Sequence, residues 1–213
     1  MRIVKDDNHV LVVVKDYNMP VQKDSSNDMD LVTALKNYLK IKYNKPGNVY
    51  LGLVHRLDRP VGGLMVFAKT SKAAERLSEM IKNKEIEKHY MAVVHGKVKE
   101  EEELIDYIVR DENTKMSYID ESGKKAILYY KLINYDEKND LSLIDVNLIT
   151  GRHHQIRLQM ASHGHPIYGD QKYGIDKKGI QIHLWSYRIK FKHPVKDEIV
   201  DITYYPDFYE RYK

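Results

Sequence analysis

Short strand-like patterns outnumber helical patterns in this sequence, and helices rarely separate them. Residues 9–15 form a β-branched run that predicts a buried strand, and residues 63–69 predict a central strand. Further strands are predicted at residues 90–98, 126–134, 142–149, 190–193 and 199–204. Because parallel strands need long crossovers, this order favours an α+β fold with a mixed, mainly antiparallel central sheet and flanking helices.

Three helices are predicted beside these strands. The first begins after Asp28 or Asp30, and the second begins at a Ser71 cap. The third covers residues 153–162 and ends at a Gly that is followed by Pro. The charged segment 99–103 is expected to be an exposed turn.

Composition excludes several classes of protein. The 213 residues are 42% hydrophobic and contain no cysteine, which allows a real core but no disulfide, thiolate metal site or Cys nucleophile. The 35 basic and 31 acidic residues permit a polyanionic partner without requiring one. No segment is typical of a signal peptide or a membrane span, so we expect a cytoplasmic protein with no membrane contact. No linker is apparent, and we expect a single domain over residues 1–213.

The first candidate functional segment is HRLDRPVGG, which begins at His55. Its carboxylate, Asp58, lies between Arg56 and Arg59 and precedes a Gly pair that permits a tight turn or the close approach of a ligand. A turn Asp that accepts local backbone hydrogen bonds is an equally good interpretation of this segment alone.

The second candidate segment runs from Gly151 to Gly174 and contains Arg157 in a helix-like stretch. A solvent-exposed Arg on an amphipathic helix is the alternative interpretation. If folding joins Arg157 to Asp58, the guanidinium favours the ionised carboxylate, which could then act as a persistent nucleophile.

Tyrosine and histidine supply further candidates. Tyr90 begins a predicted strand, and its phenol could stack on a base or move a proton, although spacing alone does not select it among 17 tyrosines. A histidine group in the second segment suggests a metal site, and a metal-dependent hydrolase is a rival hypothesis. Because His153 and His154 are adjacent, they point to different faces of a helix, and we expect no metal.

Five sequence blocks, in order, resemble the RluA-type family of RNA pseudouridine synthases over nearly the whole chain. They are IVKDDNHVLVVVKD with MPVQ, VHRLDRPVGGLMVFAKTSKAAERL, KHYMAVVHG, GRHHQIRLQMASHGHPIYGDQKYG and IHLWSYRIKFKHPV. The resemblance implies a pseudouridine synthase fold with a central catalytic cleft. It also implies an isomerase that converts uridine to pseudouridine in ribosomal or transfer RNA without a metal or an organic cofactor.

The resemblance also assigns roles to individual residues. Asp58 matches the family's catalytic Asp, Tyr90 its active-site Tyr, and Arg157 the Arg that pairs with the Asp. Arg56 matches the Arg that fills the gap left by a flipped nucleotide. The expected RNA-contacting residues are Arg56, His55, Arg59, Arg152, His154 and Gln155.

The chain departs from the family pattern in two places. Val61-Gly62 stands where many members have Thr-Ser, which removes a hydroxyl beside Asp58. Many members carry a small N-terminal RNA-binding domain, whereas the catalytic pattern here begins close to Met1, so we expect no such separate domain and a monomer. A catalytically inactive RNA-binding paralogue and a plain structural protein remain alternatives. The resemblance leaves open whether Asp58 attacks C1′, attacks C6 or forms a glycal.

Overall fold

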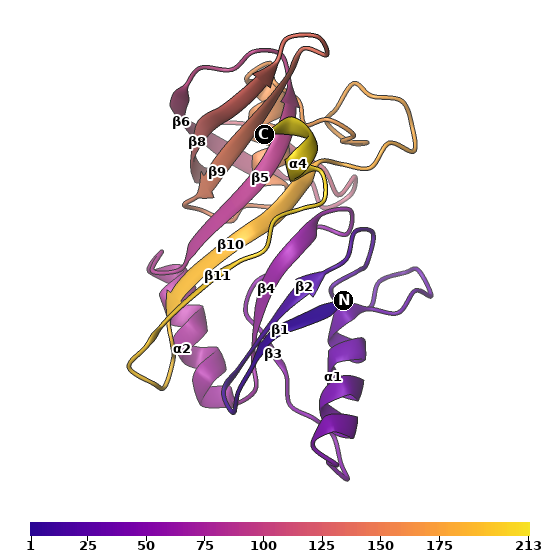
Figure 1. Cartoon of the computed structure of the whole chain (residues 1–213), viewed down its shortest axis with the longest axis vertical. Coiled ribbons are helices and arrows are strands. Elements are labelled where there is room, and N and C mark those ends of the chain that lie inside the picture. The colour runs from indigo at the N-terminus through magenta and orange to yellow at the C-terminus, as the bar shows by residue number, and fades with distance from the viewer. The chain divides into compact units, whose positions relative to one another are not determined.

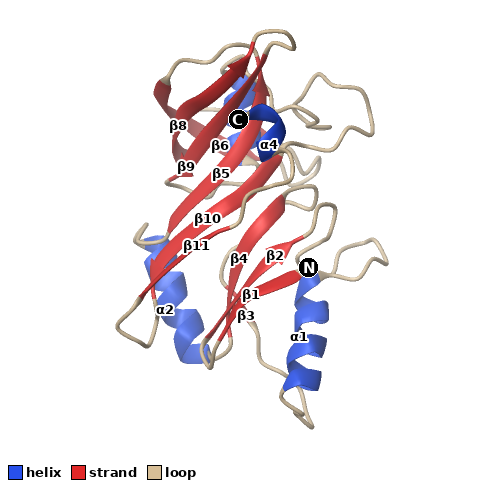
Figure 2. Ribbon diagram, viewed as in Figure 1, coloured by secondary structure: helices blue, strands red, loops and turns tan.

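The computed structural model describes residues 1–213, which divide into two compact units. Unit 1 consists of Met1–Ile86 and Ile189–Tyr204, and unit 2 consists of Glu87–Arg188 and Tyr205–Lys213. Strand β10 (Leu184–Lys192) contributes residues to both units. Figures 1 and 2 label the helices and strands. None of the helices is long and apolar enough to cross a membrane.

The strands of unit 1 centre on two fully buried segments, β2 (Val10–Lys15) and β4 (Gly62–Ala68), which pair in antiparallel fashion. Strand β1 (Arg2–Asp6) pairs antiparallel with β2. The short strand β3 (Gly52–Leu53) pairs with β4, and β11 (Ile199–Thr203) pairs with β10. The apolar runs of β2 and β4 therefore supply the core of this unit, as the sequence predicts for residues 9–15 and 63–69.

Two capped helices belong to unit 1 (Figure 2). Helix α1 (Leu31–Lys42) follows an Asp30 cap that accepts a hydrogen bond from the Thr33 amide, and it buries leucines spaced four residues apart. Helix α2 (Ser71–Lys82) packs on β3 and β4, but its cap is Thr70 rather than the predicted Ser71. Thr70 has the extended backbone of a cap, and its hydroxyl accepts from the Ala73 amide at 3.2 Å.

Unit 2 is built on an antiparallel sheet whose strands follow the order β5-β9-β8-β6-β7. These strands are β5 (Glu87–His95), β6 (Glu101–Arg110), β7 (Ser117–Ile119), β8 (Lys124–Asp136) and β9 (Leu141–Leu148). Helix α3 (Gln155–Ser162) packs on β6 and β7, and the short helix α4 (Tyr209–Tyr212) packs on β8. Leu158 of α3 joins Ile108 and Ala126 in a buried apolar cluster.

The α+β class with mainly antiparallel pairing is confirmed, but two further local predictions are wrong besides the Ser71 cap. Residues 99–103 do not form a turn, because β6 begins at Glu101 and pairs with β8 along its length. Helix α3 begins at Gln155 rather than residue 153, because His154 has a left-handed φ of 55° that cannot continue a helix. The expectation of a single domain over residues 1–213 stays a prediction.

Candidate active site

Asp58 lies on a turn that leads into β4 of unit 1. Its backbone carbonyl accepts a hydrogen bond from the Val61 amide at 3.0 Å, which closes the turn. Leu57 and Val61 are buried on either side and anchor the turn in the core, whereas Asp58 itself is only partly buried. The turn predicted from the sequence is therefore present, and Asp58 lies on it as a partly buried residue.

Lys15, at the end of β2, holds this turn in place. Its side chain is fully buried, and its ammonium donates to the backbone carbonyls of Asp16, Met19 and Arg59 at 3.0, 2.8 and 3.0 Å. Three carbonyl acceptors match the three donors of a lysine ammonium. Because the Arg59 carbonyl follows Asp58 directly, Lys15 ties the turn to the loop after β2.

Both burial and the charge of Asp58 affect the pKa of Lys15. Burial lowers the pKa of Lys15 to about 7, and the negative charge of Asp58 acts in the opposite direction. The two groups are thus close enough to influence each other's charge.

The other residues around Asp58 have local contacts of their own. His55 accepts a hydrogen bond from the Val66 amide at Nε2, which places the ring proton on Nδ1. Arg59 extends its guanidinium to Asp24, Asp28 and Ser26 in the loop before α1. Arg56, by contrast, is exposed. The side chain of Arg59 is also 40% exposed, so two of the three expected RNA contacts in unit 1 are accessible to solvent.

Arg157 of α3 forms a buried two-pronged ion pair with Asp170. Its Nε donates to Asp170 Oδ2 at 2.8 Å, and its Nη2 donates to Oδ1 at 2.6 Å. The side chains of both residues are at most 4% exposed. Arg157 is therefore not a solvent-exposed helix residue. The two hydrogen bonds also fix the plane and direction of its guanidinium.

The loop that carries Asp170 is itself tightly constrained. Burial raises the pKa of Asp170, but the Arg157 guanidinium and the amides of Lys172 and Tyr173 outweigh burial and leave the pKa below its usual value. Gly169 has a φ of 79°, and a Cβ there would collide with the Gln181 carbonyl. The Gly-Asp pair thus serves to orient Arg157.

The segment before α3 is a dense network of side-chain contacts. Gln155 accepts from the Arg152 amide and donates to the Ile127 carbonyl. His154 contacts the Tyr173 hydroxyl at 2.8 Å and stacks on His153 with ring centroids 3.7 Å apart. Arg152 is exposed and donates from Nε to the Lys125 carbonyl. Gln155 and His154 thus shape the segment, and their contact with RNA stays a prediction.

Tyr90 lies on the buried face of β5. It is 6% exposed and stands opposite Val146 of β9, which in turn stands opposite Tyr130 of β8. Asp58 belongs to unit 1, whereas Tyr90 and Arg157 belong to unit 2. The structure describes one group of candidate residues in each unit, and the pairing of Asp58 with Arg157 stays a prediction.

Sequence reasoning missed two residues of these groups. Lys15 ends a β-branched run, and a lysine at the end of a strand is normally exposed, whereas Lys15 is buried. The one sequence feature that could have indicated its role is its place in the block that resembles the family's opening strand and loop. Asp170 lies within the Gly151–Gly174 segment, but no pattern there assigns it a role. A buried Arg requires an acceptor, and this requirement is the signal that could have found Asp170.

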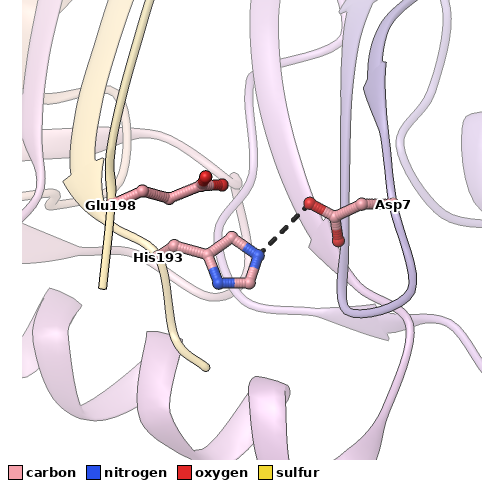
Figure 3. Close-up of side chains that lie close together, drawn as sticks. All are labelled: Asp7, His193 and Glu198. Atoms are coloured by element: carbon pink, nitrogen blue, oxygen red, sulfur yellow. Dashed lines mark ion pairs between the residues drawn. The ribbon is translucent and has the colours of Figure 1, made fainter. Parts of the chain in front are cut away.

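The histidines of the second segment each have a separate partner. His163 contacts Asp106, His165 contacts the His95 carbonyl, and His153 contacts Ser117. Within residues 1–213, the one group of three or more metal-binding side chains with converging ligand atoms lies elsewhere, at Asp7, His193 and Glu198 of unit 1 (Figure 3).

That group does not have the chemistry of a metal site. His193 accepts at Nδ1 from the amides of Val195 and Lys196, so its ring proton is on Nε2, which faces Asp7 Oδ2 at 3.2 Å. A protonated Nε2 offers no lone pair to a metal. The ammonium of Lys5 lies 3.6 Å from Asp7 Oδ2 and 3.3 Å from Glu198 Oε1, so lysine already balances these carboxylates.

Comparison with known proteins identifies the relatives of this chain. The family model described as RNA pseudouridylate synthase matches residues 9–162. An uncharacterised RNA pseudouridine synthase of Aquifex aeolicus is 32% identical over 93% of this chain and 67% of its own length. Ribosomal large subunit pseudouridine synthase D of Zymomonas mobilis is 34% identical over 94% of this chain and 68% of its own length. Synthase C of Rickettsia bellii is 37% identical over 82% of this chain and 57% of its own length.

Solved structures agree in fold. Human RNA pseudouridylate synthase domain containing 4 matches 98% of this chain and 90% of its own, with a TM-score of 0.81 at 20% identity. The corresponding domain-containing protein 1 matches 99% and 85%, with a TM-score of 0.78 at 21% identity. These likenesses confirm the predicted pseudouridine synthase fold. Together with the family match over most of the chain, they lead to one conclusion: this chain belongs to the RNA pseudouridine synthase family, a family of RNA-modifying isomerases.

Proposed function

We propose that this chain converts uridine to pseudouridine in RNA, with Asp58 as the nucleophile. The observation that carries the proposal is the Asp58 turn, whose backbone is fixed by the buried Lys15 ammonium through the Arg59 carbonyl. A nucleophilic carboxylate must be ionised and aimed, and a constrained turn beside a buried lysine meets both needs. Family membership supplies the reaction to which such a carboxylate is suited.

The reaction breaks the N1–C1′ glycosidic bond, turns the uracil and joins its C5 to C1′. A stacked nucleotide cannot react, so the target uridine is first extruded, at a cost of a few kcal/mol. The exposed Arg56 fills the vacated space and stacks on neighbouring bases, which offsets part of that cost. Atoms and electrons balance within one nucleotide, and we therefore propose that no metal or organic cofactor takes part.

Asp58 then acts on the extruded nucleotide, and Arg157 keeps the carboxylate ionised. The fork with Asp170 uses Nε and Nη2 of Arg157 and so sets the direction in which the rest of the guanidinium points. Tyr90 packs against the detached uracil and assists the loss of the C5 proton. The proposal is the same for attack at C1′, attack at C6 or a glycal, because each route requires an ionised carboxylate at this position.

Ribosomal RNA is the favoured substrate and transfer RNA the second candidate. The names of the relatives from Rickettsia bellii and Zymomonas mobilis specify the large ribosomal subunit for those proteins. The 213 residues span 57% of the Rickettsia bellii relative and 68% of the Zymomonas mobilis relative, and we propose that they act as one catalytic domain and as a monomer.

The proposal is tested with unmodified large-subunit ribosomal RNA and transfer RNA transcribed in vitro. After incubation with the protein, each RNA is treated with a carbodiimide that marks pseudouridine, and the marked positions are read by reverse transcription. We expect pseudouridine at defined positions, formed equally well in EDTA. RNA that is bound but unmodified would indicate an inactive RNA-binding paralogue, and loss of product in EDTA would indicate a metal-dependent reaction.

A further inference from the structure

Lys88 lies on the same face of β5 as the candidate residue Tyr90. Residues two apart on a strand project from one face, so the two side chains leave the sheet in the same direction. Strand β9 runs antiparallel to β5, pairs with it from His89↔Asn147 onward, and ends at Leu148. The chain that leaves β9 therefore passes close to Lys88 as it enters the second candidate segment.

The side chain of Lys88 reaches that segment. Its Nζ is 3.8 Å from the point where Gly151 would carry a Cβ, if it had one. Gly151 precedes the Arg152–Gln155 network and α3, which carries Arg157. The Lys88 ammonium thus lies beside two of the segments that supply the candidate residues of unit 2.

Lys88 differs from the other cations of these segments because it has no partner. Arg157 binds Asp170, and Arg152 binds the Lys125 carbonyl, whereas the side-chain ammonium of Lys88 makes no hydrogen bond or ion pair in residues 1–213. The side chain is nevertheless partly buried, and burial alone lowers its pKa. A desolvated ammonium without an acceptor is unfavourable, and an anion that arrives with a ligand would relieve this cost.

A purely structural role explains less. A lysine whose methylene chain covers apolar surface normally extends its ammonium into water. The ammonium of Lys88 is partly withdrawn from water, which lowers its pKa, although no acid in the protein compensates for it. The base of a uridine carries no negative charge, so the anion that an RNA substrate offers at this place is a backbone phosphate.

We propose that Lys88 binds a backbone phosphate of the RNA strand and so holds the target nucleotide against the face of β5 that carries Tyr90. This inference rests on the proposed function, because it takes RNA as the ligand. Lys88 acts as a positioning residue rather than a catalytic one. Arg152, which is exposed and follows Gly151 directly, adds a second positive charge for the same strand.

The test measures binding of unmodified large-subunit ribosomal RNA at several salt concentrations, with filter binding as the readout. Lys88→Met removes the charge and keeps the apolar stem, Lys88→Arg keeps the charge, and Lys88→Gln is a second neutral variant in case the first fails to fold. The matched control is Lys138→Met, an exposed lysine in the turn between β8 and β9. Circular dichroism confirms that each variant is folded.

We expect Lys88→Met and Lys88→Gln to weaken binding about tenfold, as the loss of one charge-assisted contact predicts. The slope of log affinity against log salt should fall by about one contact, and Lys88→Arg should restore it. Unchanged affinity and slope in a folded neutral variant, equal to those of Lys138→Met, would overturn the inference.

The inference and the proposed function fail in different ways. Wild-type protein that binds RNA with a Lys88-dependent salt slope but makes no pseudouridine contradicts the proposed function and supports the phosphate contact. Wild-type protein that makes pseudouridine while the neutral Lys88 variants keep the full salt slope contradicts the phosphate contact alone. Wild-type protein that binds no RNA contradicts both.

Discussion

The ammonium of Lys15 donates a hydrogen bond to the backbone carbonyl of Arg59 at 3.0 Å, one residue beyond Asp58. The same ammonium binds the carbonyls of Asp16 and Met19, so one fully buried charge joins the loop after β2 to the turn before β4. The position of the candidate nucleophile therefore depends on a side chain that points away from solvent. This arrangement separates the group that reacts from the group that positions it.

Replacing Lys15 with Met should destabilise the protein. The substitution leaves three partly buried carbonyls without their donor, and we expect the free energy of unfolding to fall by about 3 kcal/mol. Lys15→Arg should not restore it, because a planar guanidinium cannot direct its donors at three carbonyls around one nitrogen. Urea unfolding of the three proteins measures the difference. A Lys15→Met protein as stable as wild type would show that the three hydrogen bonds contribute nothing.

Replacing Asp170 with Asn should be more damaging than its small change in size suggests. The variant leaves the Arg157 guanidinium buried without its counter-charge, which costs about 3–5 kcal/mol. A double-mutant cycle with Arg157→Met isolates the coupling between the two residues. We expect Asp170→Asn to have little further effect once Arg157 is absent. Independent, additive losses would contradict the fork as a coupled pair.

The same ion pair predicts that the stability of the protein depends on pH in the acidic range. The pKa of Asp170 is lower in the folded protein than in the unfolded chain, so its stabilising contribution is present above the unfolded pKa, near about 4. The contribution is lost as the pH falls through the folded pKa. As the pH is lowered from 5, the free energy of unfolding should therefore fall less steeply for Asp170→Asn than for wild type. Parallel slopes for the two proteins would contradict this assignment.

Gly169→Ala should disrupt the loop that carries Asp170. The position has a φ of 79°, and an added Cβ would collide with the Gln181 carbonyl. Gly179→Ala is the matched control, because Gly179 has a φ of 91° but open space around the added atom. We expect the control to lose about 1 kcal/mol from backbone strain alone and Gly169→Ala to lose clearly more. Thermal melting measures the stability of both variants. Equal losses of stability would show that the collision at residue 169 is relieved without cost.

Hydrophobic periodicity was enough to predict the elements that form the cores. The runs that became β2 and β4 are buried at every residue, and α1 buries its leucines at helical spacing. Periodicity failed at β6, where Glu101–Glu103 suggested an exposed turn. Two of those glutamates are exposed in the strand, and Glu102 accepts a hydrogen bond from Tyr130, so an acidic segment can pair within a sheet.

The candidate site was only partly predictable. Motifs identified Asp58, Tyr90 and Arg157 because short strings around them are distinctive. They did not identify Lys15, Asp170 or Lys88, whose roles depend on burial and on contacts between distant segments. The Lys15 bond to Arg59 spans 44 residues, and no local pattern encodes such a pairing.

The most direct test of the account is tritium release from RNA labelled at uridine C5, compared between wild type and Asp58→Asn. Tritium leaves C5 when that carbon forms the new bond to the sugar and loses its hydrogen. The account predicts release by wild type and none above background by the variant, with RNA affinity retained by both. Appreciable release by folded Asp58→Asn protein would contradict the assignment of Asp58 as the nucleophile.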